Sequence, residues 1–241
     1  MTDFPIIETR GLVKRFGGVE VLRGIDFTVG HRELRCLIGP NGAGKSTFFK
    51  CLTGQLRPCE GAISFKGDLV GGGSCVKNAR LGIGIKTQVP SLYDGLSVYE
   101  HIWLAVRYKL SGPQLAETVQ GMIEKFDLVH LEKRLVGQLP HGQRQLVEIA
   151  MVAASCPDLI LLDEPAAGMT HQDVERLAEL LLALRADHAL IVVEHDMNFV
   201  RMIGETVTVL HQGRVLVEAD VDTVMRDRFV RDVYLGRRET A

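Results

Sequence analysis

Polar and apolar residues alternate in short runs near the start of the chain, and this period of two predicts β-strands. The expected strands are separated by glycine-containing turns and cover 6–10, 19–22, 25–29 and 34–38. Beyond Ser97, apolar residues recur every three or four positions, as at Val98, Ile102 and Val106, which predicts helices with one apolar face. The 241-residue chain therefore begins with a β-rich region and continues into a helical one.

Strand-length apolar runs then alternate with helical patterns. The expected strands cover 61–65, 83–87, 159–163, 189–193, 206–210 and 214–217, and the expected helices cover 98–106, 115–126, 142–155, 172–185 and 196–203. The glycine-rich stretch 71–74 is expected to form a flexible loop. Strands that alternate with helices predict a largely parallel sheet with both faces covered.

These elements fit one α/β domain that spans 1–241. We expect 1–88 and 157–241 to form the α/β lobe, with an antiparallel β subdomain near the N-terminus, and 89–156 to form an inserted helical subdomain. The hydrophobic content of 46% is ample for the core of such a domain.

A glycine-rich loop follows the apolar run at 34–38 and precedes a helical pattern. It reads Gly39-Pro40-Asn41-Gly42-Ala43-Gly44-Lys45-Ser46, which is the G-x-x-x-x-G-K-S/T pattern of a phosphate-binding loop, and we include the next residue, Thr47, in the site. The glycines let successive N–H groups point inward, and the helix adds its positive end, so the loop suits a polyphosphate. We expect Lys45 to reach the β- and γ-phosphates and Ser46 to bind Mg²⁺.

A second motif lies where the apolar run at 159–162 ends in two carboxylates, Asp163 and Glu164. We expect Asp163 to hold the same Mg²⁺ through water from the end of a buried strand. Together with the phosphate loop, this motif predicts that the chain binds and hydrolyses ATP. The alternative, a glycine-rich turn with a surface lysine, leaves the second motif unexplained.

Charge and composition narrow the possible partners. The net charge is −2 and there is no Lys/Arg cluster, so a nucleic-acid partner is not expected. No apolar run approaches the ~20 residues that span a bilayer, and the start of the chain has no signal-peptide pattern, so we expect a cytoplasmic protein. The five cysteines include no C-x-x-C pair, which argues against a disulfide framework and against a zinc site.

The order of the motifs resembles the ATPase subunit of ATP-binding cassette (ABC) transporters over nearly the whole chain. The phosphate loop is followed by Gln88, the helix start Leu139-Pro-His-Gly-Gln143, Leu-Leu-Asp-Glu-Pro at 161–165 and Glu194-His-Asp196. The resemblance implies a phosphate-loop NTPase fold with MgATP, and a homo- or heterodimer of such subunits stacked head to tail around two ATP molecules. It also implies transmembrane permease partners, an indirect periplasmic solute-binding partner, and a place at the inner face of the cell membrane.

The resemblance also assigns roles to single residues. Glu164 is expected to be the general base, and His195 the switch histidine that contacts the γ-phosphate. Gln88 is expected to sense Mg²⁺ and the attacking water. Phe16 is expected to stack on adenine, with an ordinary core phenylalanine as the alternative.

The helix that starts near Gly142 is expected to meet the nucleotide of the opposite subunit, through His141, Gly142 and Gln143. This chain has Pro140-His141 where the family commonly has Ser-Gly, and proline offers neither a hydroxyl nor an N–H to a phosphate. We expect a protonated His141 to compensate; the alternative is a solvent-facing histidine and a weaker ATP sandwich. The run Ala167-Gly-Met-Thr170 also replaces the family's Ser-Ala-Leu-Asp and removes its aspartate.

Shorter matches resemble one branch, the importers of branched-chain amino acids and urea. They are Phe16-Gly-Gly18, Arg80-Leu-Gly-Ile-Gly84, Ala167-Gly-Met169, Glu194-His-Asp-Met197 and Tyr234-Leu-Gly236. His141 together with Gly168-Met169 resembles the urea subunit most. The sequence thus predicts the ATPase of an importer of a small polar solute, and the alternatives are a soluble ABC ATPase outside transport or an exporter subunit.

Overall fold

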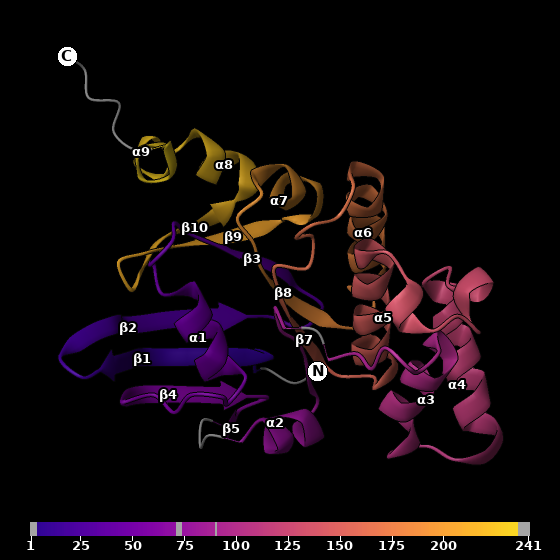
Figure 1. The fold of residues 1–241 in the computed structure, drawn as a ribbon. Helices are drawn as coiled ribbons and strands as arrows, with labels where there is room; N and C mark the ends of the chain where they lie inside the picture. The colour runs from indigo at the N-terminus through magenta and orange to yellow at the C-terminus, as the bar shows by residue number, and fades with distance from the viewer. Residues whose placement is uncertain (1–3, 71–73, 90, 236–241) are drawn as a thin grey trace.

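The computed structural model describes residues 4–70, 74–89 and 91–235, which form two sheets and the helices around them (Figure 1). The smaller sheet is antiparallel and has the order β2-β1-β4-β5, where the strands are β1 (Ile7–Phe16), β2 (Val19–Val29), β4 (Glu60–Phe65) and β5 (Asp68–Leu69). The expected strands 19–22 and 25–29 are in fact one strand, β2, so that prediction was wrong. Gly24 has a φ of +77°, and the register shifts beside it, so the chain passes through a bulge without leaving the sheet.

The larger sheet has the order β10-β9-β3-β8-β7-β6. Its strands are β3 (Leu34–Ile38), β6 (Ile83–Lys86), β7 (Leu159–Asp163), β8 (Ala189–Val193), β9 (Thr206–His211) and β10 (Arg214–Asp220). The strands from β9 to β6 are parallel, and β10 pairs antiparallel with β9. Every residue of β3, β7 and β8 is buried, which is why these strands read as continuous apolar runs.

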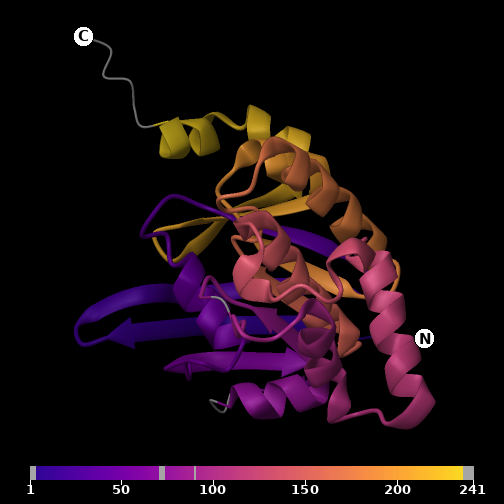
Figure 2. The ribbon, with the colours of Figure 1, turned by 45° about the vertical axis from the view of Figure 1, so that its right-hand side comes forward.

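A group of helices connects β6 to β7. It consists of α3 (Val98–Arg107), α4 (Gly112–Lys125), two short 3₁₀ turns at Val129–Leu131 and Val136–Gln138, and α5 (His141–Ala154). The Ser97 hydroxyl accepts from the Glu100 N–H while the Glu100 carboxylate accepts from the Ser97 N–H, a capping box that starts α3. Helices α3 and α4 pack on α5, which packs on β6 and α6 (His171–Leu184), so the group stands beside the sheets (Figures 1 and 2). The subdomain boundaries at 89 and 156 stay a prediction.

The remaining helices lie against the larger sheet and at both of its edges. They are α1 (Lys45–Leu52), α2 (Cys75–Leu81), α7 (Met197–Ile203), α8 (Val221–Arg226) and α9 (Arg228–Leu235). The sequence analysis did not predict α2, α8, α9 or β5. Residues 71–73 of the expected flexible loop and Gly236 of the last short match lie outside the described residues.

Alternate residues of the central strands enter two different cores. In β7, Leu159 and Leu161 face the core that contains α1 and the antiparallel sheet, whereas Ile160 and Leu162 face the core that contains α5, α6 and α7. Both faces are therefore buried, and the carboxyl ends of β3, β7 and β8 lie side by side at one edge. In parallel α/β sheets this edge is the usual place for ligands.

Candidate functional site

The phosphate loop lies at this edge, between β3 and α1, in a backbone path that requires glycine. A Cβ at Gly39 would lie 2.3 Å from the Leu210 carbonyl oxygen. Gly44, which precedes α1, has a φ of +103°, and a Cβ there would lie 3.0 Å from Leu22 Cδ2. The helix therefore begins at Lys45 with its free N–H groups directed toward the loop.

Lys45 is 8% exposed and folds back over its own loop. Its Nζ donates to the Gly39 carbonyl at 2.5 Å and to the Pro40 carbonyl at 3.1 Å. Burial lowers the pKa of Lys45, and the carboxylates of Glu164 and Asp163 act in the opposite direction. The ammonium is thus held by two neutral acceptors, which a triphosphate could replace.

A cavity of about 330 Å³ opens over the loop. It is lined by residues from three parts of the predicted site: Asn41 to Thr47 of the loop, Gln88 after β6 and Glu164 after β7. The structure therefore brings the phosphate loop together with two of the three expected catalytic residues. Gly39 and Pro40 contribute through the carbonyls that hold Lys45.

Asp163 ends β7 and is 7% exposed. Its Oδ1 is buried and has no hydrogen-bond partner within the part of the chain that the structure describes. Burial, with the nearby Glu164 carboxylate, raises the pKa of Asp163 to about 6, although Lys86 and Lys50 oppose the shift. A buried carboxylate oxygen without a donor suits a hard cation or its water ligand, so this residue fits the predicted Mg²⁺.

Glu164 occupies a left-handed backbone conformation, with a φ of +46°. Non-glycine residues rarely adopt it, and such strain gathers at functional sites. The Glu164 N–H donates to the Val193 carbonyl at 2.9 Å, which ties the turn to the end of β8. The Glu164 Oε1 lies 3.4 Å from Nδ1 of His195, whose side chain is 59% exposed, so the third expected catalytic residue is also here.

Two buried charged residues of this region were missed as site residues. Glu194 is 1% exposed, and burial raises its pKa while backbone donors oppose the shift. Lys86 is 3% exposed, and burial lowers its pKa while the Glu148 carboxylate and others oppose the shift. A charged residue at the end of an apolar strand was the available signal in both cases.

The other predicted residues lie outside the phosphate-loop cavity. Phe16 is 46% exposed at the end of β1, and the Lys14 Nζ lies 5.2 Å from its ring centroid. His141, Gly142 and Gln143 form the first turn of α5, and His141 Nε2 lies 3.1 Å from the Ala167 carbonyl oxygen. Within this one chain, these residues do not line the cavity with Lys45.

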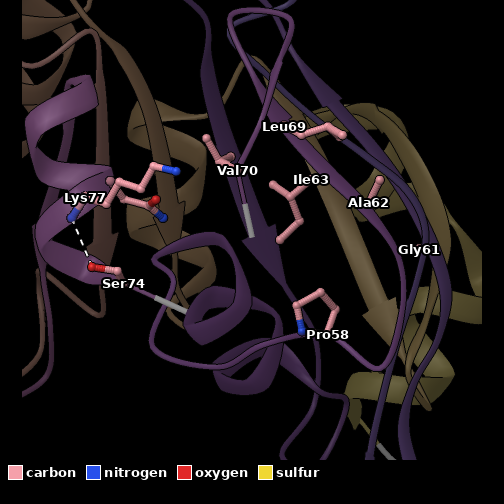
Figure 3. Close-up of a pocket in the computed structure, with 9 residues that line it drawn as sticks. Pro58, Gly61, Ala62, Ile63, Leu69, Val70, Ser74 and Lys77 are labelled. Atoms are coloured by element: carbon pink, nitrogen blue, oxygen red, sulfur yellow. Dashed lines mark hydrogen bonds between the residues drawn. The ribbon is translucent and has the colours of Figure 1, made fainter. Parts of the chain in front are cut away.

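A second cavity, of about 400 Å³, lies between the antiparallel sheet and α2 (Figure 3). Ile63 and Val70 face it from the sheet side, and Lys77, whose N–H donates to Ser74 Oγ at 3.2 Å, borders it from α2. Among the described residues, it shares no lining residue with the phosphate-loop cavity and brings no acid–base pair together.

Comparison with known proteins identifies relatives among the ATP-binding proteins of transporters. The family model described as "ABC transporter" matches residues 22–167. The chain is 32% identical to the high-affinity branched-chain amino acid transport ATP-binding protein BraF of Pseudomonas aeruginosa, over 96% of this chain and 98% of BraF. It is 35% identical to the L-arabinose transport ATP-binding protein AraG of Geobacillus stearothermophilus, over 98% of this chain but 48% of AraG.

Solved structures agree with the sequence relatives. A nucleotide-free ATP-binding cassette from an ABC transporter superposes with a TM-score of 0.86 at 27% identity, covering 97% of this chain and 100% of the other. The ADP conformation of MJ1267, another ATP-binding cassette, gives the same TM-score and identity over 97% and 99% of the two chains.

The chain therefore belongs to the ABC transporter family. It is an ATP-binding subunit that hydrolyses ATP, and the predicted resemblance, fold class and enzyme class are confirmed. Within the described ranges, no helix has the length and apolar character needed to cross a membrane.

Proposed function

We propose that this subunit energises the import of a small polar solute, with branched-chain amino acids, related amides and urea as the candidate substrates. The observation that carries the proposal is the match to BraF and to LivG of Escherichia coli along almost their whole length, since both are branched-chain amino acid transport ATP-binding proteins. Urea rests on the short match around His141 and Gly168-Met169. These relatives do not favour the alternatives, a soluble ATPase outside transport or an exporter.

The geometry supports a mechanism for hydrolysis. The loop N–H groups and the start of α1 bind the phosphates, and Lys45 exchanges the Gly39 and Pro40 carbonyls for phosphate oxygens. Ser46, Asp163 and Gln88 would hold Mg²⁺, in part through water, and the ion would supply positive charge to the phosphates. Glu164 orients the attacking water and takes its proton, while His195, within 3.4 Å of Glu164, donates to the γ-phosphate.

A second copy of the subunit, or a close relative, completes each site in this proposal. The first turn of α5 presents His141, Gly142 and Gln143 to the nucleotide bound by the opposite subunit, and the helix N-terminus favours an anion there. Phe16 is exposed, and it stacks on the adenine of the ATP that the phosphate loop of the same subunit binds.

Permease subunits are proposed to dock on the groove beside β6, the edge strand of the larger sheet. The groove lies between α2 and the ends of α3 and α5, and exposed Val76 and Tyr108 line it. Tyr93, which follows the Gln88 segment, is 68% exposed, whereas Leu92 is partly buried against the core. Tyr93 does not line the groove, so we propose it as a second contact for a cytoplasmic helix of a permease, in preference to Leu92. The subunit would then sit on the inner face of the membrane.

Uptake by a cell that lacks this subunit tests the proposal. Labelled leucine, an amide and urea are supplied separately to the deletion strain, complemented by the wild type or by Glu164→Gln. We expect the wild type, and not the variant, to restore uptake of one of these solutes and its dependence on a periplasmic solute-binding protein. Unchanged uptake of all of them, with altered efflux of another compound, would assign the chain to an exporter.

A further inference from the structure

The turn that carries Glu164 is held by its own backbone and by side chains from outside it. Within residues 164–169, which we call the Glu164 turn, the Ala167 N–H donates to the Glu164 carbonyl at 3.3 Å and the Met169 N–H donates to the Ala166 carbonyl at 3.2 Å. These local bonds leave the Ala166 N–H and the Ala167 carbonyl to be satisfied from elsewhere.

Glu194 satisfies the Ala166 N–H. Its Oε1 accepts that bond at 3.1 Å, and its Oε2 accepts from the His195 N–H at 3.0 Å and from the Asp196 N–H at 3.5 Å. The carboxylate is almost completely buried, so bonds from backbone donors replace the water it has lost. One side chain therefore joins the Glu164 turn to the segment that begins with His195.

His141, the first residue of α5, reaches the Ala167 carbonyl. Its Nε2 lies 3.1 Å from that oxygen and also 3.1 Å from the Gln145 amide nitrogen. If the His141 Nε2–H donates to Ala167, it cannot also face the Gln145 NH₂ group, which is a donor too. The Gln145 Oε1 is buried with no partner in the described ranges. Turning the Gln145 amide over lets its oxygen share the His141 Nε2–H with Ala167.

The ring of His141 also packs on the next residue of the turn. Gly168 has a φ of +71°, and a Cβ there would lie 3.2 Å from the His141 Cδ2. Glycine therefore serves both the left-handed turn and the close approach of the imidazole. His141 therefore contacts the Glu164 turn by van der Waals packing as well as by a hydrogen bond.

We propose that Glu194 and His141 are positioning residues for ATP hydrolysis, which together fix the Glu164 turn and hence the Glu164 carboxylate. Glu194 holds the turn in register with His195, and His141 holds it against the N-terminus of α5. Glu164 sits in a strained conformation, which persists only when its surroundings determine it. The contacts also make the placement of Glu164 depend on α5. This link does not involve position 170, where the chain has Thr170 in place of the family's aspartate.

Amide hydrogen exchange of the nucleotide-free protein tests directly whether Glu194 and His141 hold the Glu164 turn. We compare the wild type with Glu194→Gln and with His141→Phe, which keeps a ring but loses the N–H donor. Faster exchange of the amides at 166–169, by roughly tenfold, is expected in both variants. Glu194→Gln leaves one acceptor oxygen where the carboxylate binds Ala166 with one oxygen and His195 with the other, and His141→Phe loses the donor to Ala167. His130→Phe and Glu179→Gln, at exposed positions of the chain, are the matched controls. Unchanged exchange at 166–169 in both variants would overturn the proposal.

Measurements of kcat and of the Kd for ATP give a second test of the proposal. Both variants should lose about 10- to 100-fold in kcat while the Kd for ATP stays within about twofold, because the phosphate loop is untouched. His141→Gln, whose amide N–H can reach the Ala167 carbonyl, should lose clearly less of the rate than His141→Phe. The double variant should lose less than the product of the single losses, since both residues act on one turn.

A fall in ATP affinity that matches the fall in kcat would mean that the variants impair nucleotide binding rather than the placement of Glu164, and losses that multiply in the double variant would mean that the two residues act independently. Either result overturns the proposal. His141 is exposed, so His141→Phe should fold normally even if Glu194→Gln does not. In that case the comparison of His141→Phe with His141→Gln decides.

Discussion

At the residue scale, one edge of the sheet gathers side chains that are costly to bury and are not neutralised by simple ion pairs. Lys45 bonds to carbonyls, and Asp163 keeps an oxygen without a donor in the described ranges. Buried charges without an opposite charge lower the stability of a fold, so stability alone does not account for these two residues. A bound polyphosphate and the proposed cation would supply the missing partners.

The motif residues of this site were predictable because each stands at a fixed spacing in a loop or at the end of an apolar run. Glu194 and Lys86 were not, because a charged residue after a strand is usually exposed, and only the packing of other segments shows that these two are buried. The contact of His141 with Ala167 was equally unpredictable, since it joins residues from two separate elements.

Replacing Glu164 by glutamine should separate binding from turnover. In the proposed mechanism, Glu164→Gln removes the group that takes the proton of water, so we expect near-normal ATP affinity with a loss of roughly 10²- to 10⁴-fold in turnover. Trapped ATP should then favour a dimer. Phosphate release, beside gel filtration with and without MgATP, measures both effects. An unchanged hydrolysis rate would remove Glu164 from the mechanism.

Asp163 should make the nucleotide-free protein less stable as the pH rises. Its folded pKa, about 6, lies above the ordinary aspartate value of 3.8, so the folded state binds more protons between these values. Stability should therefore fall from pH 4 to pH 6 and then level off, by about 3 kcal/mol at most for a shift of this size.

Asp163→Asn removes this penalty, and we expect it to raise the free energy of unfolding at pH 8 but not at pH 4, measured by urea denaturation. MgATP should stabilise the wild type more than this variant, because the variant lacks the carboxylate that fits the cation. Equal stabilisation of both proteins would count against Asp163 as part of the Mg²⁺ site.

At the element scale, buried parallel strands were the most predictable parts of the fold. The expected ranges 34–38, 159–163 and 189–193 are the bounds of β3, β7 and β8, since burial on both faces produces continuous apolar runs. The antiparallel β2 was divided wrongly because Gly24 marks a bulge as readily as a turn. Short helices such as α8 lack the length over which a helical period can be recognised.

The start of α5 allows a test of the two departures from the family pattern. Pro140→Ser adds a hydroxyl where the helix would meet the opposite nucleotide, and we expect faster dimer-dependent hydrolysis. If a protonated His141 contacts that nucleotide, ATP-dependent dimerisation should strengthen from pH 8 to pH 6, a range that brackets ordinary histidine titration at about 6.5.

His141→Gly and His141→Gln should both abolish this pH response, measured by analytical ultracentrifugation in a Glu164→Gln background. The glutamine can keep the contact with Ala167 but cannot become charged, so it separates the two roles of the side chain. A pH response equal in the wild type and both variants would show that His141 is not a phosphate ligand.

At the scale of the whole molecule, α5 connects the Glu164 turn with the segment that follows Gln88. Helix α5 begins at His141, beside the Glu164 turn, and two turns later its buried Glu148 accepts a hydrogen bond from the Ser91 N–H, in the segment after Gln88. A partner that moves residues 91–93 would therefore act on the helix that contacts the Glu164 turn. This arrangement could not be inferred from motif order, because it depends on how α5 packs against both segments.

Tyr93 is the side chain at which this connection should be tested. Its ring is exposed, while its N–H donates to Nε2 of buried His101 at 2.9 Å, so the backbone is fixed and the side chain is available to a partner. We expect Tyr93→Glu to leave the ATPase rate of the isolated subunit within about twofold and to abolish solute uptake, because a buried, unpaired charge would oppose docking of a permease helix. Leu69→Glu, an exposed apolar residue on β5, is the matched control and should leave uptake unchanged. Normal uptake by Tyr93→Glu would exclude this surface as the permease contact, whereas loss of ATPase activity together with uptake would mean that the variant disturbs the Gln88 segment itself.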